Sequence, residues 1–135
     1  MNEISDKTDV KSILEMDKLV FDKLYFERKG FKNENELELN VQIEVGEVID
    51  SEIYKVTVTM NGEKKDEYDF IVQITGFFSL EGVNDQTLKD VLLTQNAVAI
   101  LMPYIRSQIS LLTAQPDVDC VVLPPINIME LVKDI

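Results

Sequence analysis

Apolar and polar residues alternate along much of the first half of the chain, a pattern typical of strands with one buried face. The clearest stretch runs from Glu36 to Val48, and its apolar positions are Leu37, Leu39, Val41, Ile43 and Val45. Side chains on a strand point alternately to its two faces, so these residues share one face and the polar residues between them share the other. We expect a strand with an apolar side in the core and an acidic side in solvent.

Two further strands with the same alternation follow. Ile53 to Met60 places Tyr54, Val56, Val58 and Met60 on one face, and Glu67 to Leu80 does the same with Tyr68, Phe70, Val72 and Ile74. Between them, Asn61-Gly62 predicts a tight turn, because both residue types tolerate a positive φ angle.

The N-terminal region has a less regular pattern. Leu19 to Arg28 is interpreted as a strand, Asp9 to Asp17 stays open between helix and strand, and the polar residues 1–10 are expected to be flexible. Lys29 to Asn33 predicts a turn. Because the connections between successive strands are short, we expect a four-stranded antiparallel sheet with meander topology.

A helical period replaces the strand period after the fourth strand. Apolar residues recur at helical spacing from Leu88 to Leu112, which predicts one long helix from about Asp85 to Thr113, capped by Asn84 or Asp85. Pro103 lies inside this helix and is interpreted as a kink that packing tolerates. At ~1.5 Å per residue the helix is ~40 Å long, more than one small domain needs, so it is a candidate subunit interface.

The C-terminal segment is apolar but irregular until its end. Val118 to Ile128 contains Pro124-Pro125, which force extended backbone, and Asn127 is placed to cap a short helix from Ile128 to Ile135. The fold class that follows is α+β. We expect a single domain over residues 1–135, with the sheet followed by a long helix, an apolar proline loop and a short C-terminal helix.

Composition narrows the classes of function. The 135 residues carry a net charge of -12, which disfavours binding to nucleic acid and to acidic lipid surfaces. An apolar run of ~18 residues, as a membrane-spanning helix requires, is absent from the sequence. The N-terminus shows no secretory signal pattern, so we expect a cytoplasmic protein without direct membrane insertion.

The residues available for catalysis are few, because the chain contains no histidine and one cysteine, Cys120. This composition excludes Ser-His-Asp and Cys-His pairs and histidine ligands for zinc. The acidic groups Glu34, Glu36, Glu38 and Asp66, Glu67, Asp69 are interpreted as solvated strand faces and turns rather than metal or acid–base sites. We therefore expect no enzymatic activity, no metal and no cofactor.

Three motifs resemble those of the SecB protein-export chaperones. Gly76 to Gly82 (GFFSLEG) resembles the family's glycine- and phenylalanine-containing turn, and Ile100 to Arg106 (ILMPYIR) resembles its helix motif, with Met102 where phenylalanine is usual. Leu123 to Ile128 (LPPINI) resembles its proline segment. The motifs occur in the family's order at comparable spacing, and the resemblance covers about Val20 to Ile135.

The resemblance implies an ATP-independent chaperone that binds unfolded precursor proteins and passes them to the SecA motor of the Sec translocase. It also implies a homotetramer, a dimer of dimers with long helices packed between sheets. By motif, the candidate residues of a client-binding groove are Val121, Leu123, Pro124, Pro125, Ile126, Ile128 and Leu131. The candidate residues for helix packing and oligomer assembly are Ile100, Pro103, Tyr104 and Arg106.

For docking to the motor, the resemblance points to acidic residues on the sheet. Glu27 matches one such position, whereas Lys23 and Ile71 stand at two others. The neighbouring Asp22 and Asp69 are candidates to compensate.

Other classes of function stay open at this point. Some SecB-like proteins protect the antitoxin of a toxin–antitoxin pair, and this chain is a candidate for that role. A small carrier domain for an apolar ligand would require a closed internal cavity. A hydrolase that uses carboxylates alone would require a facing acidic pair, which the spacing does not identify.

Overall fold

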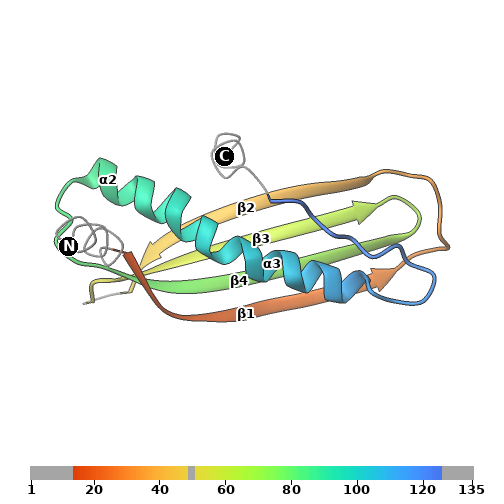
Figure 1. The fold of residues 1–135 in the computed structure, drawn as a ribbon, viewed down its shortest axis with the longest axis horizontal. Coiled ribbons are helices and arrows are strands. Elements are labelled where there is room, and N and C mark those ends of the chain that lie inside the picture. The colour runs from red at the N-terminus through yellow and green to blue at the C-terminus, as the bar shows by residue number, and fades with distance from the viewer. Residues whose placement is uncertain (1–13, 49–50, 126–135) are drawn as a thin grey trace, which may run out of the picture.

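Four long strands form one antiparallel sheet in the computed structural model, which describes residues 14–48 and 51–125 (Figure 1). The strands are β1 (Leu14–Arg28), β2 (Leu37–Glu47), β3 (Ile53–Lys64) and β4 (Tyr68–Leu80), in the sheet order β1-β4-β3-β2. The predicted four-stranded antiparallel sheet is confirmed. The first strand begins at Leu14 rather than Leu19. The last residues of the segment Asp9 to Asp17, which the sequence left open between helix and strand, are therefore part of a strand.

The position of β1 differs from the predicted meander. Strands β2, β3 and β4 follow one another as a meander, but β1 pairs with β4, from Leu14 opposite Leu80 to Arg28 opposite Tyr68. The chain therefore crosses the end of the β3–β4 hairpin between β1 and β2. This arrangement places apolar side chains of β1, among them Phe21 and Phe26, beside the most buried strand, where they extend the core.

The turn between β3 and β4 also differs from the prediction. Asn61-Gly62 lies inside β3, with Gly62 opposite Phe70, and the chain turns at residues 65–67, where Asp66 has a φ angle of 63°. A Cβ atom at Gly62 would lie 2.2 Å from Cζ of the buried Phe70 ring. Glycine is thus required here for close approach of a ring, not for a turn.

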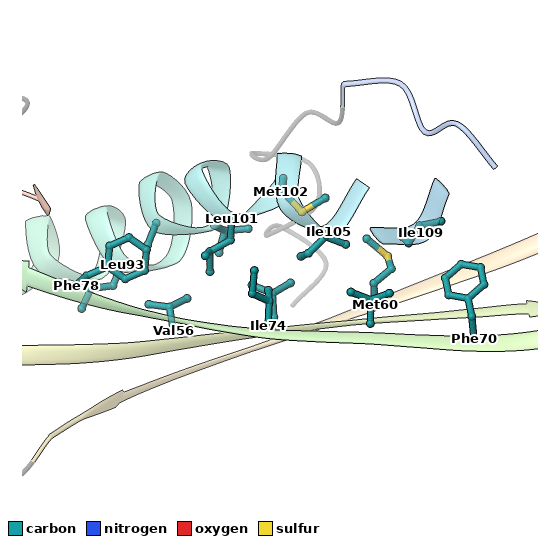
Figure 2. Close-up of a cluster of buried hydrophobic side chains, with 14 of the residues drawn as sticks. Val56, Met60, Phe70, Ile74, Phe78, Leu93, Leu101, Met102, Ile105 and Ile109 are labelled. Atoms are coloured by element: carbon teal, nitrogen blue, oxygen red, sulfur yellow. The ribbon is translucent and has the colours of Figure 1, made fainter. Parts of the chain in front are cut away.

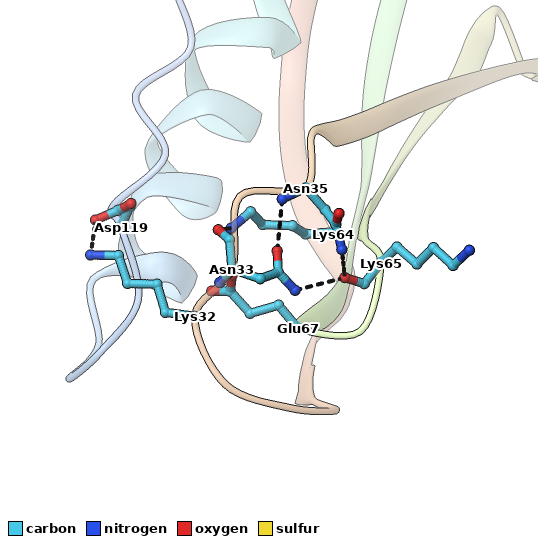
Figure 3. A network of polar contacts seen from close by, with 7 residues as sticks. All are labelled: Lys32, Asn33, Asn35, Lys64, Lys65, Glu67 and Asp119. Atoms are coloured by element: carbon cyan, nitrogen blue, oxygen red, sulfur yellow. Dashed lines mark hydrogen bonds and ion pairs between the residues drawn. The ribbon is translucent and has the colours of Figure 1, made fainter.

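A buried carboxylate organises the crossing connection between β1 and β2 (Figure 3). Glu67 is 2% exposed, forms an ion pair with Lys64 and accepts a hydrogen bond from the Asn33 backbone N–H at 3.0 Å. Its backbone carbonyl accepts from the N–H groups of Lys29 and Gly30 at 2.7 and 3.1 Å. The interpretation of Glu67 as a solvated acid was therefore wrong, because its carboxylate pairs inside the fold.

The long helix covers one face of the sheet and is interrupted by a π-helical turn. The successive segments are α2 (Gln86–Val91), η1 (Leu92–Asn96) and α3 (Ala97–Thr113). Asp85 is the N-cap and accepts from the Thr87 N–H at 3.0 Å, as the sequence predicted. Figure 2 shows the core between helix and sheet, in which Leu93, Leu101, Met102, Ile105 and Ile109 face Val56, Met60, Phe70, Ile74 and Phe78.

The chain leaves α3 at Thr113 and continues without regular structure to residue 125. The predicted C-terminal helix, Ile128 to Ile135, lies outside the described residues. Among the helices that the structure describes, none is long and apolar enough to cross a membrane.

The close contact at Gly62 predicts a large difference between two glycine substitutions in the sheet. Gly62→Ala should lower the free energy of unfolding by about 1–3 kcal/mol, because the new methyl group overlaps a buried ring. Gly46→Ala in β2 is the matched control and should change it little, since nothing lies within 4 Å of its Cβ position. Urea unfolding of both variants measures the difference, and equal unfolding midpoints would contradict the packing described.

The Glu67 network makes a second prediction. Glu67→Ala should destabilise the protein by about 3 kcal/mol or more, because it leaves the Lys64 ammonium, itself largely buried, without its anionic partner. Glu63→Ala removes an exposed carboxylate from the same hairpin and should cost less than about 0.5 kcal/mol. Thermal or urea unfolding distinguishes the two, and a Glu67→Ala midpoint equal to that of Glu63→Ala would show that the network is dispensable.

Candidate functional site

Residues 118–125, here called the strap, run beside α3 over the inner face of the sheet (Figure 1). Val118, Val121 and Leu123 are half-buried and pack against the core. Cys120 and Val122 alternate with them and are exposed, with Val122 76% accessible. From Cys120 onward the strap is therefore extended chain with apolar residues on both its inward and its outward side.

Polar side chains attach the strap to the body of the protein. On α3, the Arg106 Nε donates to the Leu123 carbonyl at 3.2 Å and the Ser110 hydroxyl to the Val121 carbonyl at 2.8 Å. The Thr113 hydroxyl accepts from the Val121 N–H at 2.8 Å.

An ion pair ties the start of the strap to the connection between β1 and β2. The Lys32 ammonium lies 2.7 Å from the Asp119 carboxylate (Figure 3). Its hydrogen bond and charge lower the pKa of Asp119, and the same contact raises the pKa of Lys32. Because both groups are solvated, the pair orients the strap rather than adding much stability.

A groove of about 690 Å³ lies between the strap and the side of α3 that faces away from the sheet. Its lining includes Pro103, Ser107, Leu111, Ala114, Cys120 and Val122. Leu111 is 66% exposed and Val122 is 76% exposed. The lining has no carboxylate, and its ionic group is the Arg106 guanidinium, which already donates to the strap. Such a lining can bury apolar side chains but offers no acid–base pair.

The residues predicted for the groove that the structure describes occupy three positions. Leu123 packs against the core and also lines the groove, whereas Val121 lines a smaller pocket of about 180 Å³ with Leu37 and Tyr68. Pro124 and Pro125 are exposed at the end of the strap. Ile126, Ile128 and Leu131 lie outside the described residues.

Sequence reasoning missed Leu111, Ala114 and Val122 as groove residues. The helical period contained a signal for Leu111, because Ile105, Ile109 and Leu112 face the sheet and position 111 then falls on the opposite side. No local signal identified Val122, since its exposure depends on which strap residues α3 holds inward.

Three of the four residues predicted for helix packing and assembly lie on the outward side of α3. Ile100 is 36% and Tyr104 is 43% exposed, and Pro103 is also exposed. They belong to an apolar row that continues along α2 through Leu88 and Val91. Arg106 is different, because its guanidinium is half-buried and faces the strap.

The three residues predicted for motor docking lie on β1 and β4, on or beside the sheet face opposite the helix. Two have partners already, since Asp22 accepts from the Thr75 hydroxyl at 2.5 Å and Asp69 pairs with Lys29 at 2.8 Å. Glu27 lies opposite Asp69 and raises the pKa of the Tyr25 hydroxyl by hydrogen bonding. That face also has a hollow of about 720 Å³, whose lining includes Tyr25, Glu38, Glu63, Asp69 and Ile71.

No cluster of three or more metal-ligating side chains occurs within residues 14–48 and 51–125. The expectation that the chain needs no metal stays an expectation, because the remaining residues also contain carboxylates.

The chain is similar to known proteins in both sequence and fold. An uncharacterized protein of Methanocaldococcus jannaschii is 38% identical over 88 residues, which cover 62% of this chain and 54% of that protein, so the match spans about half of that relative's length. In structure, the chain matches the Mycobacterium tuberculosis SecB-like chaperone Rv1957, solved in complex with a ChAD peptide from the HigA1 antitoxin. The TM-score is 0.72 at 12% identity, over 89% of this chain and 92% of that one.

A second structure, a Streptococcus agalactiae protein of unknown function, matches with a TM-score of 0.50 at 11% identity, over 82% of this chain and 96% of that one. At such identities the structural matches show the fold alone. The sequence model of the SecB family, described as preprotein translocase subunit SecB, matches residues 23–134. The chain therefore belongs to the SecB family of chaperones.

Proposed function

We propose that this protein is an ATP-independent chaperone that binds extended apolar segments of non-native proteins in the groove between the strap and α3. The observation that carries the proposal is the pair of large apolar side chains, Leu111 and Val122, which are 66% and 76% exposed on the two walls of one groove. Apolar walls with little charge select for apolar side chains but not for a particular sequence. Membership of the SecB family supports this role.

One groove gives only modest affinity. At about 25 cal/mol per Å² of apolar surface, burying a few client side chains barely exceeds the cost of ordering the segment. Several grooves on a homotetramer that act on one client raise the effective concentration and give tight binding without sequence specificity. The outward row with Ile100 and Tyr104 offers the apolar surface that such an assembly would bury. The net charge of -12 per chain favours solubility of the assembly.

Two biological roles fit this mode of binding. In the first, the chaperone keeps precursor proteins export-competent and passes them to SecA, with Asp22, Glu27 and Asp69 on β1 and β4 as candidate docking residues. In the second, it serves a toxin–antitoxin system, which the likeness to Rv1957 with its bound antitoxin peptide favours. The carrier alternative is weaker, because the apolar groove lies at the surface, where Leu111 and Val122 are exposed.

The groove assignment predicts the effect of two charged substitutions. Leu111→Asp with Val122→Asp should weaken client binding about tenfold or more, because each carboxylate must lose water when an apolar segment binds. The measurement is light scattering of a denatured, slow-folding precursor that is diluted into protein without ATP. The wild type should suppress aggregation near stoichiometry.

Phe31→Asp is the matched control for these substitutions. Phe31 is 74% exposed, comparable with Val122, but belongs to the β1–β2 connection and not to the groove lining. It should suppress aggregation as well as the wild type. Equal loss of suppression in the control and the groove variant would contradict the assignment, and a folded wild type that suppresses nothing would contradict the general chaperone role.

A further inference from the structure

Three polar side chains of helix α3 bind the backbone of the strap. Arg106, Ser110 and Thr113 are spaced four and three residues apart, so they lie on one face of the helix. We propose that they form a clamp that fixes residues 121–123 in one register, and that they are thereby positioning residues for the groove on which the proposed function rests.

Thr113 is the most buried member of the clamp. It is 0% exposed, and its hydroxyl donates to the Ile109 carbonyl at 2.8 Å while it accepts from the Val121 N–H at 2.8 Å. Both hydrogen-bonding functions of the hydroxyl are therefore used inside the protein. Without this acceptor, the half-buried Val121 N–H would lose its partner.

The strap depends on these side chains because sheet-type pairing does not hold it. Among the described residues, the backbone hydrogen bonds outside helices and strands include one from the strap, from the Val118 N–H to the Gln115 carbonyl at 3.2 Å. From residue 119 onward, the contacts of the strap backbone go to side chains of α3. Pro124 and Pro125 lack N–H groups and cannot add donors.

The clamp determines which strap residues face the groove. Both backbone groups of Val121 are bound to α3, and extended chain turns successive side chains to opposite sides, so Val121 faces the core and Val122 the groove. A shift by one residue would exchange these positions, bury Val122 and place a different strap residue on the groove wall. The hydrogen bonds at Val121 thus determine the shape of the groove, whose volume is about 690 Å³.

Amide hydrogen exchange at Val121 tests the clamp directly. Thr113→Val keeps the shape of the side chain but removes the acceptor, and with Ser110→Ala it should speed exchange of the Val121 amide about tenfold or more. Thr113→Ser retains the hydroxyl and should leave the exchange rate near that of the wild type. Ser107→Ala, a groove residue without a hydrogen bond to the strap, is the second control. If the double variant does not fold, the single variant Ser110→Ala is measured instead, and its rate of exchange at the Val121 amide should also rise.

A double-mutant cycle tests whether the clamp positions the groove wall. Val122→Asp should weaken binding of a fluorescent apolar peptide about tenfold in the wild-type background and less than about twofold when the clamp is removed, because Val122 no longer holds its place. Unchanged Val121 exchange, or an equal effect of Val122→Asp in both backgrounds, would overturn the proposal. A wild type that binds no peptide would refute the proposed function, while Val121 exchange would still decide whether the clamp exists.

Discussion

The structure depends on how much of the sheet one helix can cover. An α-helix with its side chains is about 10–12 Å wide, whereas three spacings of about 4.8 Å between four strands already make about 14 Å before side chains are added. The helix lies over β4, β1 and β3, and the fully buried side chains of the sheet belong to β3 and β4. On β2 the inner face is incompletely covered, and Leu39 and Val45 are 41% and 42% exposed. The strap covers part of the sheet face that the helix leaves open, and its position beside the helix creates the groove.

This constraint connects the fold to the proposed activity. A strap that lies in a gap and is held by side chains leaves apolar residues on its outer surface, because both of its sides are apolar in sequence. The long connection between β1 and β2 contributes at the other end, since the Glu67 network fixes this connection and Lys32 on it pairs with Asp119 of the strap. The proposed binding of non-native chains would require no catalytic group and no nucleotide, only exposed apolar surface on a protein whose net charge favours solubility.

Local pattern and short connections predicted the elements and the pairing of β2, β3 and β4, but not the position of β1. The alternation in β2, β3 and β4 and the Asp85 cap were sufficient to place three strands and the helix. The pairing of β1 with β4 joins residues forty or more positions apart, and no short-range signal contains it. The turn prediction at Asn61-Gly62 failed for a related reason. Glycine is needed at position 62 because the Phe70 ring on the next strand approaches it closely, not because the backbone turns there. Glu67 was misread because its burial depends on Asn33, which approaches only where the chain crosses the hairpin, whereas Lys64 lies three residues away in the same turn.

The candidate site, too, was predicted only in part from local sequence. The proline motif identified the strap, and Leu123 within it, but which strap residues face the groove depends on the contacts with Arg106, Ser110 and Thr113. Of these residues, Arg106 ends the helix motif and was predicted for packing and assembly, whereas Ser110 and Thr113 lie outside the three motifs. Their effect becomes visible only when the helix and the strap are seen side by side.

The central claim, that non-native chains bind in the groove between the strap and α3, can be tested by crosslinking from Cys120. This residue is the chain's one cysteine, is exposed and lines the groove, so a photo-activated crosslinker can be attached there without any substitution. Irradiation with a denatured client in the absence of ATP should give a covalent complex, and the same label at Phe31→Cys in a Cys120→Ala background should give little. Efficient crosslinking from position 31 with none from Cys120 would contradict the account, because clients would then bind elsewhere on the protein.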